Sequence, residues 1–146
     1  MSRYFSEKYS SLVPYTPGEQ PKDTQYIKLN TNESPYKPSA LAIKLANKAS
    51  QNLQLYSDPT CSELVKTAAE KFNISEDEII FTNGSDEVLN FAFMAYCNEN
   101  TPAVFANITY GFYKVFAQIN NVPSKVIPLN NDFTINVDDY KNTNGT

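Results

Sequence analysis

Histidine and tryptophan are absent from this 146-residue sequence, and arginine occurs only once, as Arg3. Without histidine the chain has no histidine-based catalytic triad, no histidine metal site and no histidine pH switch. With a single guanidinium, two-pronged recognition of a carboxylate or a phosphate has to come from other groups.

Charged residues and cysteines are also few. Twelve basic and sixteen acidic residues give a net charge of −4, without the basic stripe that nucleic-acid binding needs. Cys61 and Cys97 form no CxxC motif, so we expect two buried, reduced thiols and no metal site. No apolar run approaches the roughly 18 residues of a membrane span, and no apolar signal segment opens the chain. These features predict a cytoplasmic protein without nucleic-acid or membrane partners.

The residues that are present predict a folded α/β protein. Hydrophobic residues make up 41% of the chain and aromatic residues 13%, which is typical of packed domains. Five of the nine prolines lie in residues 1–38, which we interpret as an extended arm. We expect a first domain part, 1–55, with the arm and first helix, and a second, 56–146, belonging to a larger domain.

Apolar periodicity and capping patterns locate the elements. The predicted helices are Pro38–Leu53, Thr60–Phe72 with a Thr60–Glu63 capping box, Glu87–Tyr96 and Phe112–Ile119, with another beginning near Asp138. The predicted strands are Ile27–Leu29, Ile79–Thr82, Ala103–Ala106, Ser124–Leu129 and Phe133–Val137. Helix Glu87–Tyr96 is apolar nearly all round, so we expect it to be covered on both sides. So few strands would form a thin sheet, and we expect an interrupted sequence.

The turn Asn83-Gly84-Ser85-Asp86 is the first candidate site. It joins a predicted strand to the start of a helix, where backbone N–H groups and the helix dipole favour an anion. The same residues also suit such a turn for conformational reasons alone. The spacing matches neither a P-loop nor a GxGxxG motif.

The second candidate is Thr109–Tyr113, which follows the predicted strand Ala103–Ala106. Ligands of open α/β sheets bind beyond the carboxyl ends of strands, and Tyr110 offers a flat apolar ring with a hydroxyl. The alternative is a core tyrosine. Three further polar or aromatic residues lie on proline-rich turns and could equally decorate the surface; they are Tyr15, Asn32 and Tyr56.

Five segments occur in an order and spacing that resemble the N-terminal part of the histidinol-phosphate aminotransferases, a branch of the fold type I pyridoxal-phosphate enzymes. They are Val13–Gly18, Leu29–Pro35, Leu55–Pro59, Thr82–Glu87 and Thr109–Tyr113. The resemblance implies a partial three-layer αβα large domain preceded by an extended arm. It also implies pyridoxal 5'-phosphate as cofactor, a homodimeric parent, and transamination between L-histidinol phosphate and 2-oxoglutarate.

The resemblance assigns roles residue by residue. Gly84, Ser85 and Asp86 match the turn whose amides hold the cofactor phosphate, in agreement with the anion site inferred above. Tyr110 matches the aromatic residue that stacks on the pyridine ring. Tyr56 matches a tyrosine that reaches the cofactor phosphate of the neighbouring subunit.

Two more residues, Tyr15 and Asn32, match arm positions near the amino substrate, although the motif around Asn32 reads Asn-Glu-Ser-Pro. The Schiff-base lysine of the family has no match here, so we assign no catalytic residue. We therefore expect an N-terminal fragment that is inactive alone and marginally stable or prone to aggregate.

Other readings stay open. A related pyridoxal-phosphate enzyme, such as a threonine-phosphate decarboxylase, would share these motifs. A non-catalytic remnant could keep the phosphate site, and a small structural protein could carry the motifs by coincidence.

Overall fold

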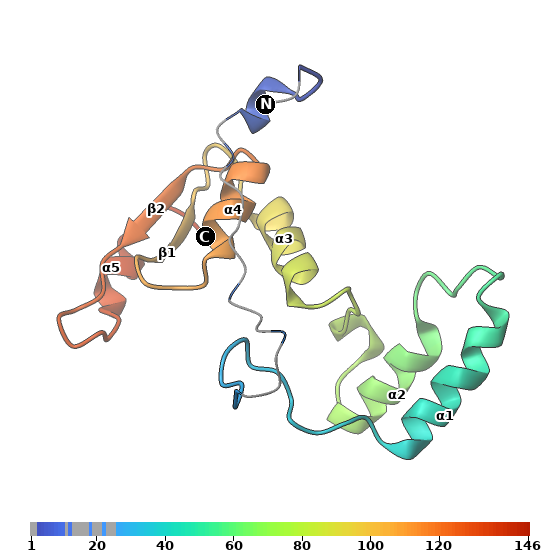
Figure 1. Cartoon of the computed structure of the whole chain (residues 1–146). Coiled ribbons are helices and arrows are strands. Elements are labelled where there is room, and N and C mark those ends of the chain that lie inside the picture. The colour runs from blue at the N-terminus through green and yellow to red at the C-terminus, as the bar shows by residue number, and fades with distance from the viewer. Residues whose placement is uncertain (1–2, 11, 13–17, 19–21, 23–25) are drawn as a thin grey trace. The chain divides into compact units, whose positions relative to one another are not determined.

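The computed structural model describes residues 3–10, 12, 18, 22 and 26–146. The chain divides into two compact units (Figure 1). Unit 1 comprises Met1–Thr16 with Thr82–Thr146, and unit 2 comprises Pro17–Phe81. The domain division expected between residues 55 and 56 stays a prediction.

Helices form the regular part of unit 2: α1 (Ala40–Ala49), η2 (Ser50–Asn52), α2 (Ser62–Phe72) and η3 (Glu76–Glu78). The helix predicted to open at Pro38 is confirmed as α1. Ser39 caps it, because the Ser39 hydroxyl oxygen accepts a hydrogen bond from the backbone N–H of Ala42 at 3.1 Å.

Asp58 holds the N-terminus of α2. Its Oδ1 accepts hydrogen bonds from the backbone N–H of Thr60 at 2.9 Å and the Thr60 hydroxyl at 2.8 Å. Its Oδ2 accepts from the backbone N–H of Ser62 at 2.7 Å and from the Ser62 hydroxyl. The predicted Thr60–Glu63 capping box is therefore wrong, since Cys61, with φ of 50°, occupies the cap position without a side-chain bond. A carboxylate can accept all four bonds, which one hydroxyl cannot.

These bonds, above all the one from the Ser62 side chain, hold the pKa of the Asp58 carboxyl far below its ordinary value of 3.8. A lowered pKa means that the folded state prefers the ionised form, so the stabilisation is complete above pH 3.8 and is lost as pH falls. We expect Asp58→Asn to lower the helical circular dichroism signal at pH 7. The difference in signal between this variant and the wild type should become smaller below pH 3.8. Asp77→Asn, outside this network, serves as control, and equal helical signals for wild type and Asp58→Asn at pH 7 would contradict the prediction.

The cap-like pattern at Ser75 is confirmed. Its backbone N–H donates to Glu78 Oε2 at 2.9 Å, while its hydroxyl oxygen accepts from the N–H of Asp77 at 3.4 Å. The strands predicted at Ile27–Leu29 and Ile79–Thr82 are wrong, since neither run is assigned as strand. A strand needs a hydrogen-bonded neighbour, and neither run has one in the described part of the chain.

Unit 1 contains the α/β part of the chain. Its elements are η1 (Glu7–Tyr9), α3 (Ser85–Tyr96), β1 (Ala103–Ala106), α4 (Phe112–Ile119), β2 (Ser124–Ile127) and α5 (Val137–Lys141). The strands pair in parallel, with Ala103 opposite Ser124 and Ala106 opposite Ile127. α4 forms the crossover between them (Figure 1), so the predicted strand–helix–strand order is confirmed for this segment.

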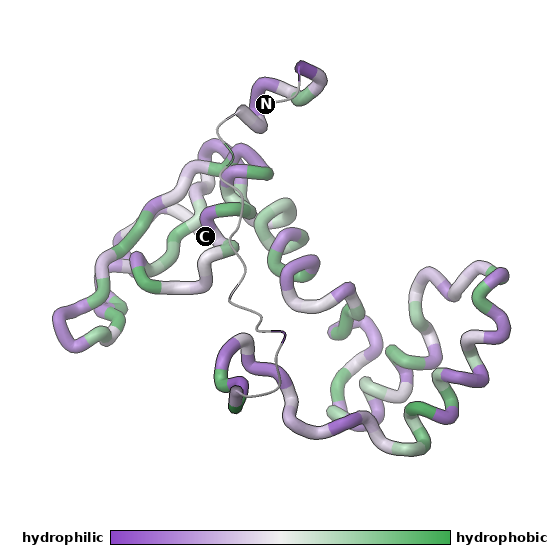
Figure 2. The backbone as a smooth tube through the Cα atoms, viewed as in Figure 1, coloured by the Kyte–Doolittle hydropathy of each residue, from purple (hydrophilic) through white to green (hydrophobic). Residues whose placement is uncertain are grey.

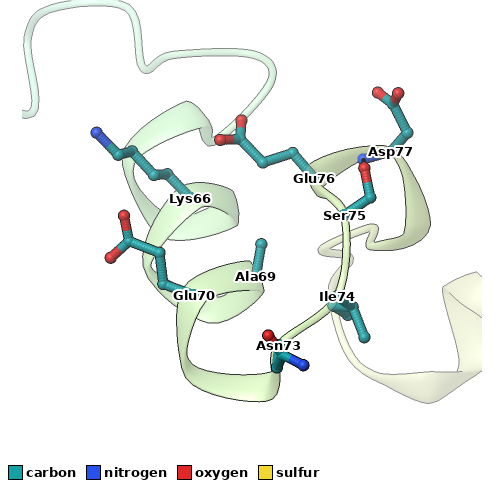
Figure 3. A pocket seen from close by; sticks show the side chains of 8 residues that line it. All are labelled: Lys66, Ala69, Glu70, Asn73, Ile74, Ser75, Glu76 and Asp77. Atoms are coloured by element: carbon teal, nitrogen blue, oxygen red, sulfur yellow. Dashed lines mark hydrogen bonds between the residues drawn. The ribbon is translucent and has the colours of Figure 1, made fainter.

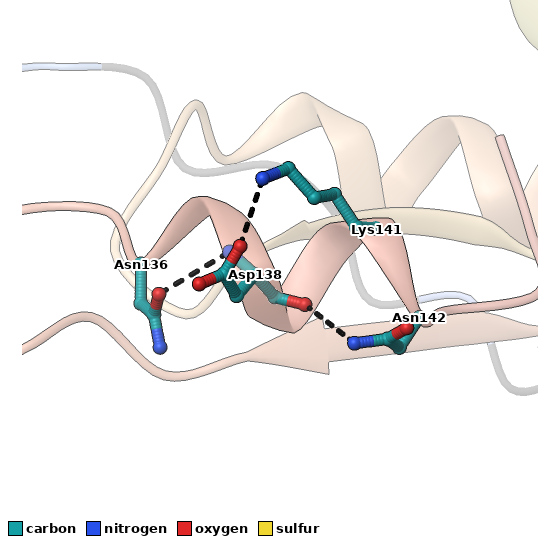
Figure 4. A network of polar contacts seen from close by, with 4 residues as sticks. All are labelled: Asn136, Asp138, Lys141 and Asn142. Atoms are coloured by element: carbon teal, nitrogen blue, oxygen red, sulfur yellow. Dashed lines mark hydrogen bonds and ion pairs between the residues drawn. The ribbon is translucent and has the colours of Figure 1, made fainter.

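The strand predicted at Phe133–Val137 is wrong. Phe133 has φ of 65°, a turn conformation, and α5 begins at Val137. The predicted helix near Asp138 is confirmed: Asn136 Oδ1 accepts from the Asp138 N–H at 3.2 Å, and Lys141 Nζ lies 2.9 Å from Asp138 Oδ1 (Figure 4).

The core of unit 1 lies between β1 and the helices α3 and α4. Its buried members are Ala103, Phe105, Ala117 and Val122, against which Phe93, Cys97 and Tyr113 pack. Burial raises the pKa of the Cys97 thiol. Cys61 is exposed in unit 2, so the expectation of a buried thiol is wrong for this residue.

Among the described residues, helix α3 makes core contacts on one side. None of its residues is buried, and Phe91 and Met94 are 43% and 61% exposed. Figure 2 shows green, hydrophobic segments along α3. The expectation that this helix is covered on both sides is wrong for the described residues, which supply core contacts on one of its sides. Within the described ranges, no helix is both long and apolar enough to span a bilayer.

Candidate functional site

Gly84 gives the turn before α3 its shape. The residue has φ of 78° and ψ of 178°, a region that side-chain-bearing residues rarely adopt. Its N–H donates to the carbonyl oxygen of Thr82 at 2.9 Å, and the Thr82 hydroxyl donates to the carbonyl oxygen of Gly84 at 2.8 Å. A Cβ on Gly84 would meet nothing within 4 Å, so backbone conformation, rather than crowding, requires glycine.

The amides that follow this turn begin a 12-residue helix, and no side chain caps its N-terminus. The first N–H groups of a helix have no partner within the helix, and the dipole places partial positive charge there. Glu87 is engaged elsewhere, because its Oε2 accepts from the N–H of Asn83 at 2.7 Å. The amides of Ser85 and Asp86 therefore suit an anion, and their assignment to a cofactor phosphate stays a prediction.

Tyr110 lies directly at this turn. Its hydroxyl donates a hydrogen bond to Asp86 Oδ1 at 2.8 Å, which joins the two candidate segments. The Tyr110 ring stacks on Phe112, with centroids 5.6 Å apart and planes at 24°, and meets Tyr113 edge-on at 5.9 Å. Tyr110 is 43% exposed, so part of the side chain stays accessible.

The loop that carries Tyr110 is anchored by Asn107 at the carboxyl ends of both strands. Asn107 Oδ1 accepts from the N–H groups of Ile108 and Leu129, each at 3.0 Å. The Asn107 N–H donates to the carbonyl oxygen of Ile127 at 2.9 Å. Sequence reasoning missed this residue, although an asparagine directly after a buried strand was a usable signal.

The remaining predicted site residues do not belong to the described part of unit 1. Tyr56 and Asn32 belong to unit 2, where Tyr56 is fully exposed and Asn32 has φ of 54°. Tyr15 lies outside the described residues. An exposed Tyr56 is compatible with a contact to another subunit, but its role stays a prediction.

A polar depression of about 450 Å³ lies at the end of α2 in unit 2 (Figure 3). Its lining is Lys66, Ala69, Glu70, Asn73, Ile74, Ser75, Glu76 and Asp77. It contains none of the predicted site residues, and its charged side chains are exposed. Within the described ranges, no three potential metal ligands cluster.

Comparisons with known proteins bear on this geometry. A family model described as "Aminotransferase class I and II" matches residues 24–145. A histidinol-phosphate aminotransferase of Clostridium acetobutylicum is 48% identical over 146 residues, covering 99% of this chain and 42% of the relative. One from Marinomonas sp. is 50% identical over 143 residues, covering 97% of this chain and 40% of the relative. The chain thus spans about two-fifths of the length of these curated relatives.

A solved structure of a Burkholderia pseudomallei protein assigned to the aminotransferases superposes with a TM-score of 0.66 at 18% identity. It covers 76% of this chain and 34% of the other, and at this identity the likeness concerns the fold alone. The predicted fold class, a partial αβα domain of this enzyme type, is confirmed, as is the predicted family resemblance. Because the family model covers most of its length, the chain belongs to the aminotransferase class I and II family.

Proposed function

We propose that this chain supplies the phosphate-holding and ring-stacking part of a pyridoxal-phosphate-dependent transaminase. The reaction would exchange an amino group between L-histidinol phosphate and 2-oxoglutarate in histidine biosynthesis. Relatives named histidinol-phosphate aminotransferase support the substrate. The observation that carries the cofactor assignment is the 2.8 Å bond from Tyr110 to Asp86, which keeps an aromatic ring beside the first amides of α3.

The residues of the turn fit a phosphate ester attached to a flat ring. Gly84 leaves open space above the backbone, and the Ser85 and Asp86 amides lie at the positive end of the α3 dipole. Tyr110 would cover one face of the pyridine ring by stacking. When bound, pyridoxal phosphate supplies an electron sink that stabilises negative charge at the substrate's amino-bearing carbon.

The chain's own part in the reaction is to bind and orient. The resemblance assigns the Schiff-base role to none of the eleven lysines, and Lys66 and Lys71 lie exposed on α2. We therefore expect reversible cofactor binding by the isolated chain and no turnover of histidinol phosphate, because moving the substrate proton needs a positioned base.

Three further assignments belong to the same proposal. Tyr56 would contact the cofactor phosphate of a second subunit in a homodimer, and its complete exposure leaves it available for this. Tyr15 and Asn32 would lie near the amino substrate. The free thiols of Cys61 and Cys97 support a cytoplasmic location, where thiols stay reduced.

The test is titration of the purified, ¹⁵N-labelled chain with pyridoxal phosphate, followed by amide NMR and absorbance. We expect reversible shifts centred on Gly84, Ser85 and Asp86, competition by inorganic phosphate, and no imine band beyond that of exposed lysine side chains with the aldehyde. Pyridoxal, which lacks the phosphate, is the matched control and should bind at least about tenfold more weakly, since it forms no charge-assisted bonds with the amides.

Shifts confined to other regions, or equal affinity for pyridoxal and pyridoxal phosphate, would contradict this proposal. Absence of any binding would favour a structural protein with coincidental motifs. Assay of the complete parent enzyme on histidinol phosphate and threonine phosphate separates the transaminase from a related decarboxylase.

A further inference from the structure

We propose that the Asp86 side chain is a positioning residue that fixes the plane of the Tyr110 ring at the amino end of α3. This inference rests on the proposed function and extends it, because the family resemblance uses only the amide of Asp86. In this assignment the backbone N–H of Asp86 binds the phosphate. The Asp86 carboxylate orients Tyr110, which stacks on the cofactor ring.

The contacts around Tyr110 define its orientation from three sides. The hydroxyl is tied to Asp86 Oδ1 at 2.8 Å, Phe112 stacks on the ring at 5.6 Å, and Tyr113 meets it at 84°. Phe112 is itself half-buried and packs on buried Phe116 at 5.5 Å. Phe116 in turn meets Phe93, which packs against the core of unit 1. The hydroxyl bond therefore adds a restraint on the ring that comes from the turn itself.

A carboxylate beside a phosphate site needs an explanation, because like charges repel. The dipole of α3 favours Asp86 in the first turn, but it would favour a phosphate there as well. The tyrosine hydroxyl has one proton to donate, and it is donated to Asp86. The same carboxylate thus orients the ring and disfavours the phosphate, and these two effects can be measured separately.

The experiment uses two probes, inorganic phosphate and pyridoxal phosphate, with the full 146-residue chain. Asp86→Ala should weaken pyridoxal phosphate binding by about 5- to 20-fold, the effect of losing a charge-assisted hydrogen bond. It should leave inorganic phosphate binding unchanged or tighter, because phosphate has no ring and meets one negative charge less. Asp86→Asn keeps an acceptor oxygen but not the charge, so it should restore part of the affinity for pyridoxal phosphate.

Two further variants make the test specific. Tyr110→Phe should match the loss of Asp86→Ala, and the double variant should lose no more than either single one, since both remove the same bond. Glu99→Ala removes an exposed carboxylate elsewhere in unit 1 and should change neither affinity. The Tyr110 ring signals in ¹³C NMR should move in Asp86→Ala without any ligand and return toward wild type in Asp86→Asn.

The possible results separate this inference from the proposed function. Suppose that the wild type binds pyridoxal phosphate at the turn. If Asp86→Ala then binds it equally well, or leaves the Tyr110 ring signals unmoved, the positioning role alone is overturned. An equal loss for both probes in Asp86→Ala also overturns it, because Asp86 would then act on the anion. A wild-type chain that binds neither probe overturns both proposals.

Discussion

Gly84→Ala is expected to lower the affinity for pyridoxal phosphate at least about tenfold and to destabilise unit 1 by about 1–3 kcal/mol. With φ of 78° and ψ of 178°, Gly84 adopts a backbone conformation that is strained for alanine, although a Cβ would meet nothing within 4 Å. Relief of this strain should rotate the adjoining peptide planes and so change the directions of the Ser85 and Asp86 N–H groups. Isothermal titration with pyridoxal phosphate and thermal denaturation measure the two effects.

The chain offers a matched control in Gly111, at the start of α4. Its φ of −59° and ψ of −25° are helical, and a Cβ there would also meet nothing within 4 Å. Gly111→Ala should therefore leave the affinity unchanged and stabilise the chain by about 0.4–1 kcal/mol, because it restricts the unfolded state. If the two alanine variants bound pyridoxal phosphate equally well, the conformation of Gly84 would not be what builds the site.

Elements with local signals were predictable from sequence. The Ser39 cap marked the start of α1, and the apolar run Ala103–Ala106 marked β1. Strands without a partner were not predictable, since Ile27–Leu29 has the composition of a strand but pairs with nothing in the described part of the chain. At α2, the prediction chose Thr60 because spacing cannot show that Asp58 reaches both Thr60 and Ser62.

The candidate site was predictable as two segments rather than as a set of contacts. Glycine with small polar residues before a helix, and Tyr110 after a buried strand, follow from general rules of α/β proteins. That the Tyr110 hydroxyl meets Asp86 depends on side-chain rotamers and on how α3 packs against α4. The anchoring role of Asn107 likewise requires β1 and β2 to lie side by side, which sequence order alone does not establish.

Phe116→Ala is expected to cost about 3–5 kcal/mol of the free energy of unfolding, the usual range for a buried phenylalanine. Phe116 is 5% exposed, and its ring lies 5.7 Å from that of Phe93 on α3 and 5.5 Å from that of Phe112. Natural domains are stable by only about 5–15 kcal/mol, and the buried core of unit 1 is small, so this variant should approach global unfolding.

The loss of packing in Phe116→Ala should also disturb the Tyr110 ring at the candidate site, because Phe116 packs against Phe112, and Phe112 stacks on Tyr110. Phe91→Ala is the control: the same substitution on α3, at a residue 43% exposed, should cost less than about 1 kcal/mol. Urea denaturation measures both costs, and the Tyr110 ring signals report whether its orientation survives. Equal losses in the free energy of unfolding for the two variants would mean that α3 and α4 do not pack through Phe116. Other residues would then have to support the Tyr110 ring.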